Sequence, residues 1–348
     1  MRAVVKKAPG FDQMEYTDIP EPAAERDLVK IRIAYSGICG TDIHAYKGTY
    51  PSTKTPVVLG HEFSGLVTAV GPEVKNVKVG DRVTSETTFA TCGVCPSCLT
   101  KDYNLCGNRR GIGTQVNGSM AEYVISREES VHLLPANVSM LAAALTEPLA
   151  CGVHAAIEKA DTGRGDVVCV FGAGAIGQMV AQVCGARGAT VIVAGVAADS
   201  QRLALAKASG AARVVNQSAE DIDAIIKEMT AAGGVDIAFE CSGAVAAANK
   251  ALGVVRRQGK VIQMGVFPRS EALIATDLIL HREIAYIGSR SQKPSSWRTA
   301  LQLMADGTVD PARIVSNIFP LTDWREAFEQ IARGEGIKNV IHCGEDIQ

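Results

Sequence analysis

The sequence has no apolar run long enough to cross a membrane. Its most apolar region, Val167 to Val196, is interrupted by Gln178, Gln182 and Arg187 and by repeated glycines, whereas a membrane helix needs about 20 mostly apolar residues. The start, MRAVVKKAPGFDQM, lacks the apolar segment of a signal peptide. We therefore expect no membrane partner and a cytoplasmic location, where cysteines stay reduced.

An excess of charge of one sign is also missing. The chain carries 35 Lys and Arg against 37 Asp and Glu, a formal net charge of -2, which provides no general attraction for nucleic acid or anionic membranes. We see no repeat, low-complexity tract or long linker. The 348 residues exceed what one hydrophobic core usually organises. These features predict two globular domains, a small-molecule partner and no nucleic acid.

The two predicted domains differ in pattern. The first 150 residues are rich in Gly and Pro and contain short apolar runs such as LVKIRIAYSG, which indicate strands joined by turns. From about Gly152, valine-rich runs such as DVVCVFG and ATVIVAG alternate with alanine-rich helical stretches. That alternation is typical of a parallel sheet with crossover helices. The fold class predicted is therefore α/β, with a mainly-β part and a doubly wound parallel sheet.

Four cysteines form a tight cluster with the pattern C-x2-C-x2-C-x7-C: Cys92, Cys95, Cys98 and Cys106. Four thiolates suit tetrahedral zinc and leave no position for a substrate, so the site is predicted to be structural. The alternatives are disulfides or unrelated core cysteines, an iron–sulfur cluster with the same ligands, and a zinc knuckle that binds nucleic acid. The segment lacks the interleaved aromatic residues that a knuckle would use.

A second group of metal-binding residue types is scattered over three stretches, YSGICGTDIHAYKG, LGHEFSG and TEPLACGVHAA. Each residue alone is a weak signal, because a lone histidine is more often structural than a ligand. Together they describe an open zinc site in which a thiolate, an imidazole and one or two carboxylates leave a coordination position for substrate. The residues are Cys39, Thr41, Asp42, His44, His61, Glu62 and Glu147.

In their order, GICGTDIH, GHEFSG, the four-cysteine loop and TEPLACGVHA resemble the zinc-dependent medium-chain dehydrogenases along essentially the whole chain. The resemblance implies that Cys39 and His61 bind catalytic zinc, and that Glu62 or Glu147 completes the site directly or through water. Zinc alcohol dehydrogenases have a cysteine where this chain has Glu147. The EPL sequence is instead similar to sorbitol and other polyol dehydrogenases. Ligation by Cys151, four residues further on, remains an alternative.

The ligand change has a chemical consequence. One thiolate with a carboxylate leaves a harder zinc centre than two thiolates do, and a harder centre better tolerates a second oxygen ligand. Since a vicinal diol offers two oxygens, we predict oxidation of a secondary hydroxyl of a polyol or sugar-like alcohol. L-threonine 3-dehydrogenases share these motifs but tend to carry DP-F in place of EPLA; inositols, sugar acids and sugar phosphates are further candidates. An alternative of another class is a non-catalytic zinc and nucleotide-binding protein.

The stretch VVCVFGAGAIG predicts a nucleotide site. Gly172, Gly174 and Gly177 follow G-x-G-x-x-G between a strand and a helix, so that a pyrophosphate can lie at the helix N-terminus. The predicted cofactor is NAD or NADP. By resemblance, further cofactor contacts come from this loop and from two later strand ends, MGV and IGSR: Ile176, Gly265, Val266 and Ser289.

The acid that usually selects NAD is missing. Such sites carry Asp or Glu at the end of the second strand, but ATVIVAG ends at Gly195. Asp199 follows four residues later and is equally placed to cap the next helix, and Arg202 could approach an adenosine 2'-phosphate. The sequence therefore allows either NAD or NADP, and NAD is slightly favoured because polyol dehydrogenases usually use it.

The resemblance also implies a proton path. Thr41 would hydrogen-bond the substrate hydroxyl and pass its proton through the cofactor ribose to His44, while Asp42 would orient the zinc-binding imidazole. Two further side chains are candidates to contact remote hydroxyls of the polyol: Tyr46, for which packing is the alternative, and Arg290.

The family arrangement implies an inserted cofactor domain. Residues 1–153 and 290–348 would form a GroES-like zinc-binding catalytic domain, and residues 154–289 a Rossmann domain. The strand IAYIG would lie at the edge of the parallel sheet and could pair with another subunit. Relatives form dimers or tetramers, and we predict a homotetramer.

Overall fold

The computed structural model describes residues 1–231, 233–269 and 271–344, and it divides into two compact units. Met1–Glu147 and Lys293–Gln348 form the first unit, and Pro148–Gln292 form the second. The predicted domain limits, at 153/154 and 289/290, stay predictions. The last residues of the predicted catalytic domain, 345–348, lie outside the described residues.

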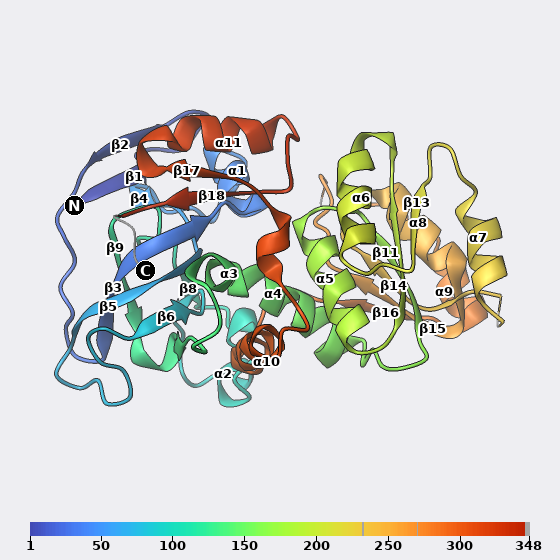
Figure 1. Cartoon of the computed structure of the whole chain (residues 1–348), viewed down its shortest axis with the longest axis horizontal. Helices are drawn as coiled ribbons and strands as arrows, with labels where there is room; N and C mark the ends of the chain where they lie inside the picture. Colours follow the sequence, from blue (N-terminus) through green and yellow to red (C-terminus); the bar gives the residue numbers. More distant parts are fainter. Residues whose placement is uncertain (232, 270, 345–348) are drawn as a thin grey trace. The chain divides into compact units, whose positions relative to one another are not determined.

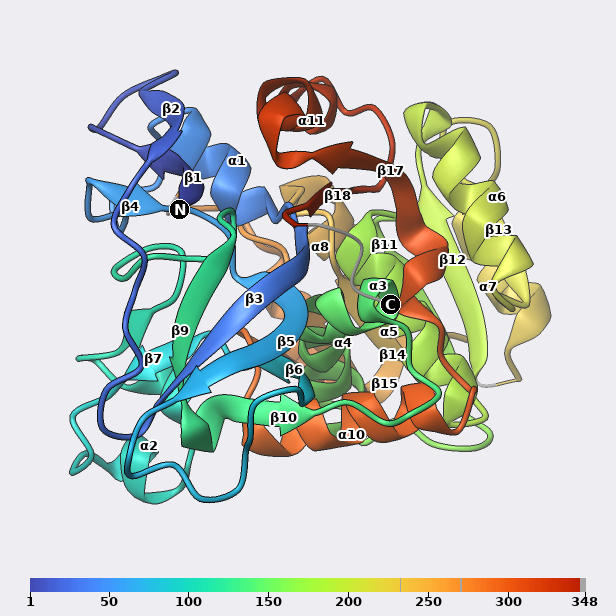
Figure 2. The same ribbon diagram turned by 60° about the vertical axis from the view of Figure 1, so that its left-hand side comes forward.

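The first unit is mainly β, as its Gly- and Pro-rich sequence with short apolar runs predicts. The sheets have the orders β10-β6-β5-β3-β18-β17, with β9 on β3, then β2-β1-β4 and β7-β8. β18 pairs antiparallel with β3, so the C-terminal strand lies beside an N-terminal one (Figure 2). The strands are β1 (Arg2–Lys6), β2 (Met14–Asp18), β3 (Leu28–Gly37), β4 (Val57–Val58), β5 (Glu62–Val70), β6 (Arg82–Ser85), β7 (Thr88–Ala90), β8 (Arg110–Gly111), β9 (Tyr123–Arg127), β10 (Val131–Leu133), β17 (Val315–Pro320) and β18 (Lys338–His342).

The helices of this unit are short except for two near its C-terminus. Pro294 begins the longer one, α10, at a position where its missing N–H costs nothing. The helices are α1 (Gly40–Tyr46), α2 (Pro96–Leu99), α3 (Met140–Ala144), α10 (Pro294–Ala305) and α11 (Trp324–Ala332), with 3₁₀ turns at Tyr103–Leu105, Glu128–Ser130, Pro311–Ile314 and Leu321–Asp323. A further helix, α4 (Thr146–Val153), contains the limit between the units.

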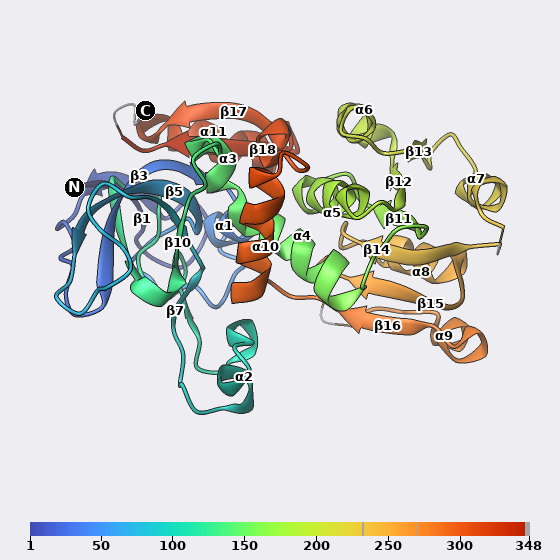
Figure 3. The same ribbon diagram turned by 60° about the horizontal axis from the view of Figure 1, so that its bottom comes forward.

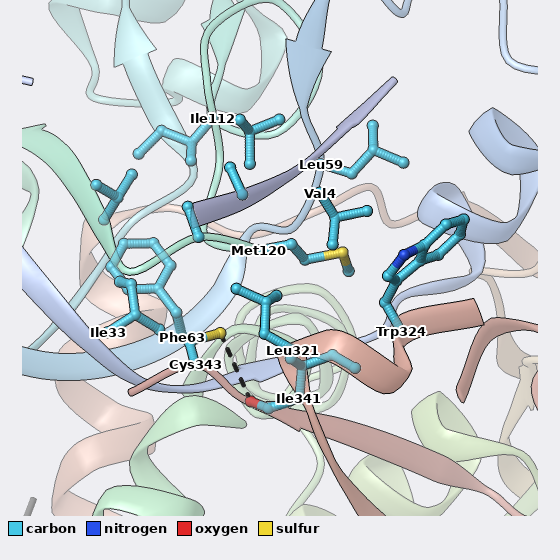
Figure 4. Close-up of a cluster of buried hydrophobic side chains, with 14 of the residues drawn as sticks. Val4, Ile33, Leu59, Phe63, Ile112, Met120, Leu321, Trp324, Ile341 and Cys343 are labelled. Atoms are coloured by element: carbon cyan, nitrogen blue, oxygen red, sulfur yellow. Dashed lines mark hydrogen bonds between the residues drawn. The ribbon is translucent and has the colours of Figure 1, made fainter. Parts of the chain in front are cut away.

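The core of the first unit joins distant parts of the chain. Val4, Phe63 and Met120 are buried together with Trp324 and Ile341 from the C-terminal segment, and Figure 4 shows these side chains converging. Burial of this apolar surface is the main term that holds the segment after α10 onto the N-terminal strands.

The second unit confirms the predicted parallel sheet. Its strand order is β13-β12-β11-β14-β15-β16, every pair is parallel, and helices cover both faces (Figures 1 and 3). The strands are β11 (Val167–Phe171), β12 (Thr190–Gly195), β13 (Arg213–Asn216), β14 (Val235–Glu240), β15 (Val255–Gln263) and β16 (Ala285–Gly288). The helices are α5 (Ala175–Ala186), α6 (Ser200–Ala208), α7 (Ile222–Met229), α8 (Val245–Val254) and α9 (Thr276–Arg282), with a π-helical turn at His154–Lys159 and a 3₁₀ turn at Ala197–Asp199.

β11 is almost wholly buried between these helices, which explains why its sequence is a continuous valine-rich run without alternation. In the described part of the chain, no helix has the length and apolar character that a bilayer crossing requires.

Candidate zinc and cofactor sites

The pairing of β3 with β5 assembles the first candidate metal site. Gly37 at the end of β3 is the register partner of Glu62 at the start of β5, which brings Cys39, just after β3, next to His61. The ligand atoms of Cys39, His61 and Glu62 all lie within 4.8 Å of one another. Cys39 is half-buried, and the other two are buried. Sequence reasoning predicted this group, and strand register is what brings it together.

Asp42 supports the group through the backbone on both sides of it. Its carboxylate accepts hydrogen bonds from the backbone N–H of Cys39 at 2.9 Å and of Gly60 at 3.1 Å. Asp42 Oδ1 lies 3.8 Å from His61 Nδ1, too far for a hydrogen bond. The expectation that Asp42 orients the imidazole stays a prediction, because its oxygens accept from the backbone beside each predicted ligand and contact His61 only at ion-pair distance.

Lys338 is a member of the site that sequence reasoning missed. It is 3% exposed, and its Nζ donates to both carboxylate oxygens of Glu62, at 2.8 and 2.9 Å, and to the Ile38 carbonyl at 2.9 Å. Burial lowers the pKa of Lys338, but the charges of Glu62 and Cys39 raise it more. Both oxygens of Glu62 therefore already have a cationic partner.

Glu147 lies in the first turn of α4 and is buried. Burial raises its pKa to about 7, although the charges of His61, Lys338 and Arg109 act in the opposite direction. Glu147 is outside the group whose atoms lie within 4.8 Å, as is Cys151. The charges of Glu147 and His61 nevertheless shift each other's pKa, so Glu147 lies near the group of Cys39, His61 and Glu62.

The donor set fits a divalent cation. A cysteine sulfur, an imidazole and carboxylate oxygens are the ligands of catalytic zinc. His61 Nδ1 is buried and has no hydrogen-bond partner among the residues that the structure describes. Burial lowers the pKa of His61, but the surrounding acidic groups, Asp42 first, raise it well above its usual value. A buried imidazole among acidic groups is an environment that a bound cation would stabilise.

Thr41 and His44 lie three residues apart on α1, on one side of the helix. Thr41 is half-buried and His44 is exposed, with His44 Nδ1 3.1 Å from Thr49 Oγ1.

The two residues predicted to contact the substrate, Tyr46 and Arg290, lie in different surroundings. Tyr46 is buried and its ring lies 5.2 Å from that of Phe11, among other core aromatics, which is the packing role that the sequence left open. Arg290 is exposed after β16 in the second unit, and its substrate contact stays a prediction.

The segment with the four cysteines, residues 92–106, which we call the lobe, has the geometry of a closed metal site. Cys98 Sγ lies 3.8 Å from Cys92 Sγ and 3.5 Å from Cys95 Sγ, and Cys106 Sγ lies 3.7 Å from Cys92 Sγ. A tetrahedron with Zn–S bonds of about 2.3 Å has edges of about 3.8 Å, whereas a disulfide would need about 2.05 Å. The cysteines are free thiols, and the lobe fits structural zinc.

The glycine loop fits a dinucleotide. Gly172 has φ +101°, in the region that favours glycine. A Cβ on Gly177 would lie 1.9 Å from the Gly172 carbonyl oxygen, while the space beside Gly174 is open. Gly174 precedes α5 without a side-chain cap, so the first N–H groups of this helix point to a site suited to pyrophosphate.

A buried carboxylate organises the strand ends of this unit, and sequence reasoning missed it. Glu240, at the end of β14, is fully buried and accepts from Gly243 N at 3.0 Å and Gln263 Nε2 at 2.7 Å. A Cβ on Gly265 would lie 2.2 Å from Gly243 N and 2.4 Å from Glu240 Oε2. Glu240 therefore holds the turn after β14 next to the end of β15, where the MGV segment that the resemblance assigns to the nicotinamide pocket begins.

The remaining predicted cofactor contacts stay predictions. Ile176 is half-buried in the first turn of α5, and Val266 is 88% exposed. Ser289 is buried and its N–H donates to the Gln263 carbonyl at 2.9 Å. Arg202 lies in the first turn of α6, where Nη1 donates to Asp199 Oδ1 at 3.1 Å.

Two family models match the chain. The alcohol dehydrogenase GroES-like domain matches residues 25–136, and the zinc-binding dehydrogenase model matches residues 175–306. D-arabitol-phosphate dehydrogenase of Enterococcus avium is 50% identical over 341 residues, covering 98% of this chain and 97% of that protein. Sorbitol dehydrogenase of Halalkalibacterium halodurans is 44% identical over 341 residues, covering 98% and 99%.

Solved structures agree with these matches. The crystal structure of galactitol-1-phosphate dehydrogenase from Escherichia coli is similar to this chain with a TM-score of 0.89 and 26% sequence identity, covering 98% of this chain and all of that one (100%).

Proposed function

The chain belongs to the zinc-binding dehydrogenases with an alcohol dehydrogenase GroES-like domain, and from this premise we propose that it oxidises a secondary hydroxyl of a polyol reversibly with NAD(P). The observation that carries the proposal is the convergence of the Cys39 sulfur, the His61 imidazole and the Glu62 carboxylate within 4.8 Å of one another. Since Glu62 is held by Lys338, Glu147 is the carboxylate we propose to complete the zinc site, directly or through water.

The chain's own residues would handle the proton. Zinc, when bound, supplies a Lewis acid that lowers the pKa of the substrate hydroxyl, and NAD(P) supplies the hydride acceptor. Thr41 would accept a hydrogen bond from the hydroxyl, and the exposed His44 would exchange the released proton with solvent. The half-burial of Thr41 and the exposure of His44 on one side of α1 support this division of roles.

Polyols are favoured over simple alcohols by the donor set. A centre with one thiolate and carboxylates is harder than one with two thiolates and suits a diol. The names of two relatives with high identity, an arabitol-phosphate and a sorbitol dehydrogenase, point to the same substrate class.

A phosphorylated polyol is the second candidate. Arg109 Nε donates to Thr88 Oγ1 at 2.9 Å and Nη2 donates to Thr87 Oγ1 at 2.7 Å, which fixes the guanidinium. Its charge acts on Glu147, so Arg109 lies in the neighbourhood of the zinc site. Guanidinium groups are well suited to phosphate, and one relative is named for a phosphorylated substrate.

Initial rates of nicotinamide reduction test both candidates. The panel contains sugar alcohols, their phosphates, inositols, L-threonine and ethanol, each with NAD and with NADP. We expect turnover of polyols or their phosphates and little of ethanol. Turnover of L-threonine alone, or equal turnover of ethanol, would contradict the proposal. Metal analysis should find two zinc ions per chain; one ion with no turnover would favour a non-catalytic zinc and nucleotide-binding protein.

We also propose a cytoplasmic location and a homotetramer. Support for assembly comes from β16, which ends the strand order of the six-stranded sheet and exposes a strand edge suited to pairing with a second copy. Light scattering of the purified protein should give the mass of four chains, and a monomer would overturn this part.

A further inference from the structure

The end of β12 is where this chain departs from the usual cofactor-selecting pattern. β12 is the strand next to β11 in the parallel sheet, and its last residue is Gly195. In dinucleotide-binding folds an acidic side chain at this place binds the ribose hydroxyls and excludes the 2'-phosphate of NADP. Glycine supplies no such group.

The 3₁₀ turn at Ala197–Asp199 brings the side chain of Asp199 back beside Gly195. A Cβ built on Gly195 would lie 3.1 Å from both Cβ and Oδ2 of Asp199, and Oδ2 accepts from the backbone N–H of Val196 at 3.1 Å. The Asp199 side chain makes no cap hydrogen bond to α6, although the residue occupies the cap position. The carboxylate therefore lies directly beside the place of a side chain at Gly195, and the capping bond that it makes closes the 3₁₀ turn before α6 and leaves α6 itself without a side-chain cap.

Two contacts fix this carboxylate relative to the glycine loop. Arg202 Nη1 donates to Asp199 Oδ1 at 3.1 Å, with side-chain exposures of 28% and 17%. The buried Gln178, directly after Gly177, donates through Nε2 to the Arg202 carbonyl at 2.8 Å and to the Ala173 carbonyl at 3.1 Å. The start of α6 is thus tied to the loop proposed to hold the pyrophosphate.

We propose that Asp199 supplies the acidic group that Gly195 lacks and selects NAD over NADP. The inference rests on the proposed dehydrogenase function and deepens it. Each Asp199 oxygen accepts one hydrogen bond from the described residues, and a carboxylate has about four acceptor positions, so two vicinal ribose hydroxyls can be bound. A 2'-phosphate in the same place would meet a negative charge. Arg202 holds the carboxylate and offsets part of its charge.

Fluorescence titration of the full-length protein with NADH and with NADPH, without substrate, measures this selection directly. We expect wild-type protein to bind NADH at least about tenfold more tightly than NADPH. Asp199→Asn keeps the shape and removes the charge, so the NADH:NADPH preference should fall about tenfold. In Asp199→Asn/Arg202→Gln, the NADPH affinity gained in the single variant should be lost again, since Arg202 is then absent as a phosphate partner.

Asp221→Asn is the matched control. Asp221 lies in the same unit and its carboxylate caps α7 by accepting from Asp223 N at 2.9 Å, so this variant removes a carboxylate with a structural task and should leave the cofactor ratio unchanged.

The outcomes separate the two levels of the proposal. Wild-type protein that binds neither dinucleotide would overturn the dehydrogenase function itself. Wild-type protein that binds NADPH as well as NADH, or a ratio that Asp199→Asn leaves unchanged, would overturn the role of Asp199 and leave the dehydrogenase function standing. The wild-type ratio is decisive even where a variant fails to fold.

Discussion

The two candidate zinc sites differ in how far apart their residues lie in the sequence. All four cysteines of the lobe fall within residues 92–106, and their spacing alone predicts a closed tetrahedral site. The open site takes Cys39, His61 and Glu62 from two strands that meet at one end of their pairing, and it adds Glu147 and Lys338 from later segments. A local ligand set is therefore visible in sequence, whereas the charge balance of a non-local site depends on strand register.

The two sites also differ in how their charge is balanced. In the lobe, four thiolates can fill the coordination of one zinc ion. In the open site, Lys338 already neutralises Glu62, which leaves fewer anionic donors for the metal and a position for substrate. We therefore expect loss of a residue from the open site to affect turnover, and loss of a lobe residue to affect mainly stability.

The largest effect should come from Cys39→Ala. Loss of the only thiolate in the open group should abolish zinc binding there and lower turnover by about 10⁴-fold or more. Metal analysis should fall from two zinc ions to one, with the lobe still loaded. Cys343→Ala is the control, because Cys343 is a buried cysteine of the same unit outside both ligand groups, and it should keep both ions. Retention of two ions by Cys39→Ala would contradict the assignment.

The next largest effect should be the cost of breaking the buried ion pair. Lys338→Met leaves the Glu62 carboxylate buried without its cation, which should destabilise the protein by about 3–5 kcal/mol in urea unfolding. Glu62→Gln together with Lys338→Met should recover part of this loss. The exposed pair of Lys250 and Asp223 provides the contrast: Lys250→Met should cost at most about 1 kcal/mol. Equal losses for the two lysines would show that burial of the Lys338 pair does not matter.

Lys338 also shows the limit of sequence reasoning. The segment KNVIHCG predicts a strand, which the structure contains as β18, but nothing in it marks the lysine as buried. Its direction is set by the pairing of β18 with β3, which places Lys338 beside Ile38 and Glu62. The glycine loop and the cysteine spacing were predictable because each is contained in one short stretch.

The same distinction explains why sequence left the contacts of two further residues, Asp42 and Tyr46, undecided. Sequence places Asp42 near His61, but whether its hydrogen bonds go to an imidazole or to backbone N–H groups depends on differences of about an ångström, which no pattern encodes. Tyr46 lies on the same short helix as His44, so sequence could not decide between substrate and core; the packing of α1 against Trp324 and Phe328 decides for the core.

A smaller effect should follow from Cys98→Ser. The variant removes one of four lobe ligands and should lose the lobe zinc, with Tm lowered by about 5 °C. The kcat of the folded protein should stay within about threefold, because no substrate position exists in the lobe. Calorimetry with metal analysis and steady-state rates checks this. A loss of turnover as large as that of Cys39→Ala would show that the lobe is not purely structural.

The smallest effect should come from Arg109, whose position three residues after Cys106 links the two sites. Its guanidinium is fixed by Thr87 and Thr88 and acts on the open site through its charge. Arg109→Gln should therefore raise KM for a phosphorylated polyol about fivefold and leave KM for the unphosphorylated polyol within about twofold. The exposed neighbour Arg110 gives the control variant, Arg110→Gln, with neither change.

Equal effects of Arg109→Gln on both substrates would remove Arg109 from phosphate recognition. If Arg109 does bind the phosphate, loss of the lobe zinc should loosen the contacts of Arg109 with Thr87 and Thr88. The reason is that β7, just before the lobe, pairs with β8, just after it. Cys98→Ser should then also raise KM for the phosphorylated polyol while kcat is kept. That selective change would show that the lobe positions a substrate-binding residue in addition to stabilising the fold, and its absence would show that the two zinc sites act independently.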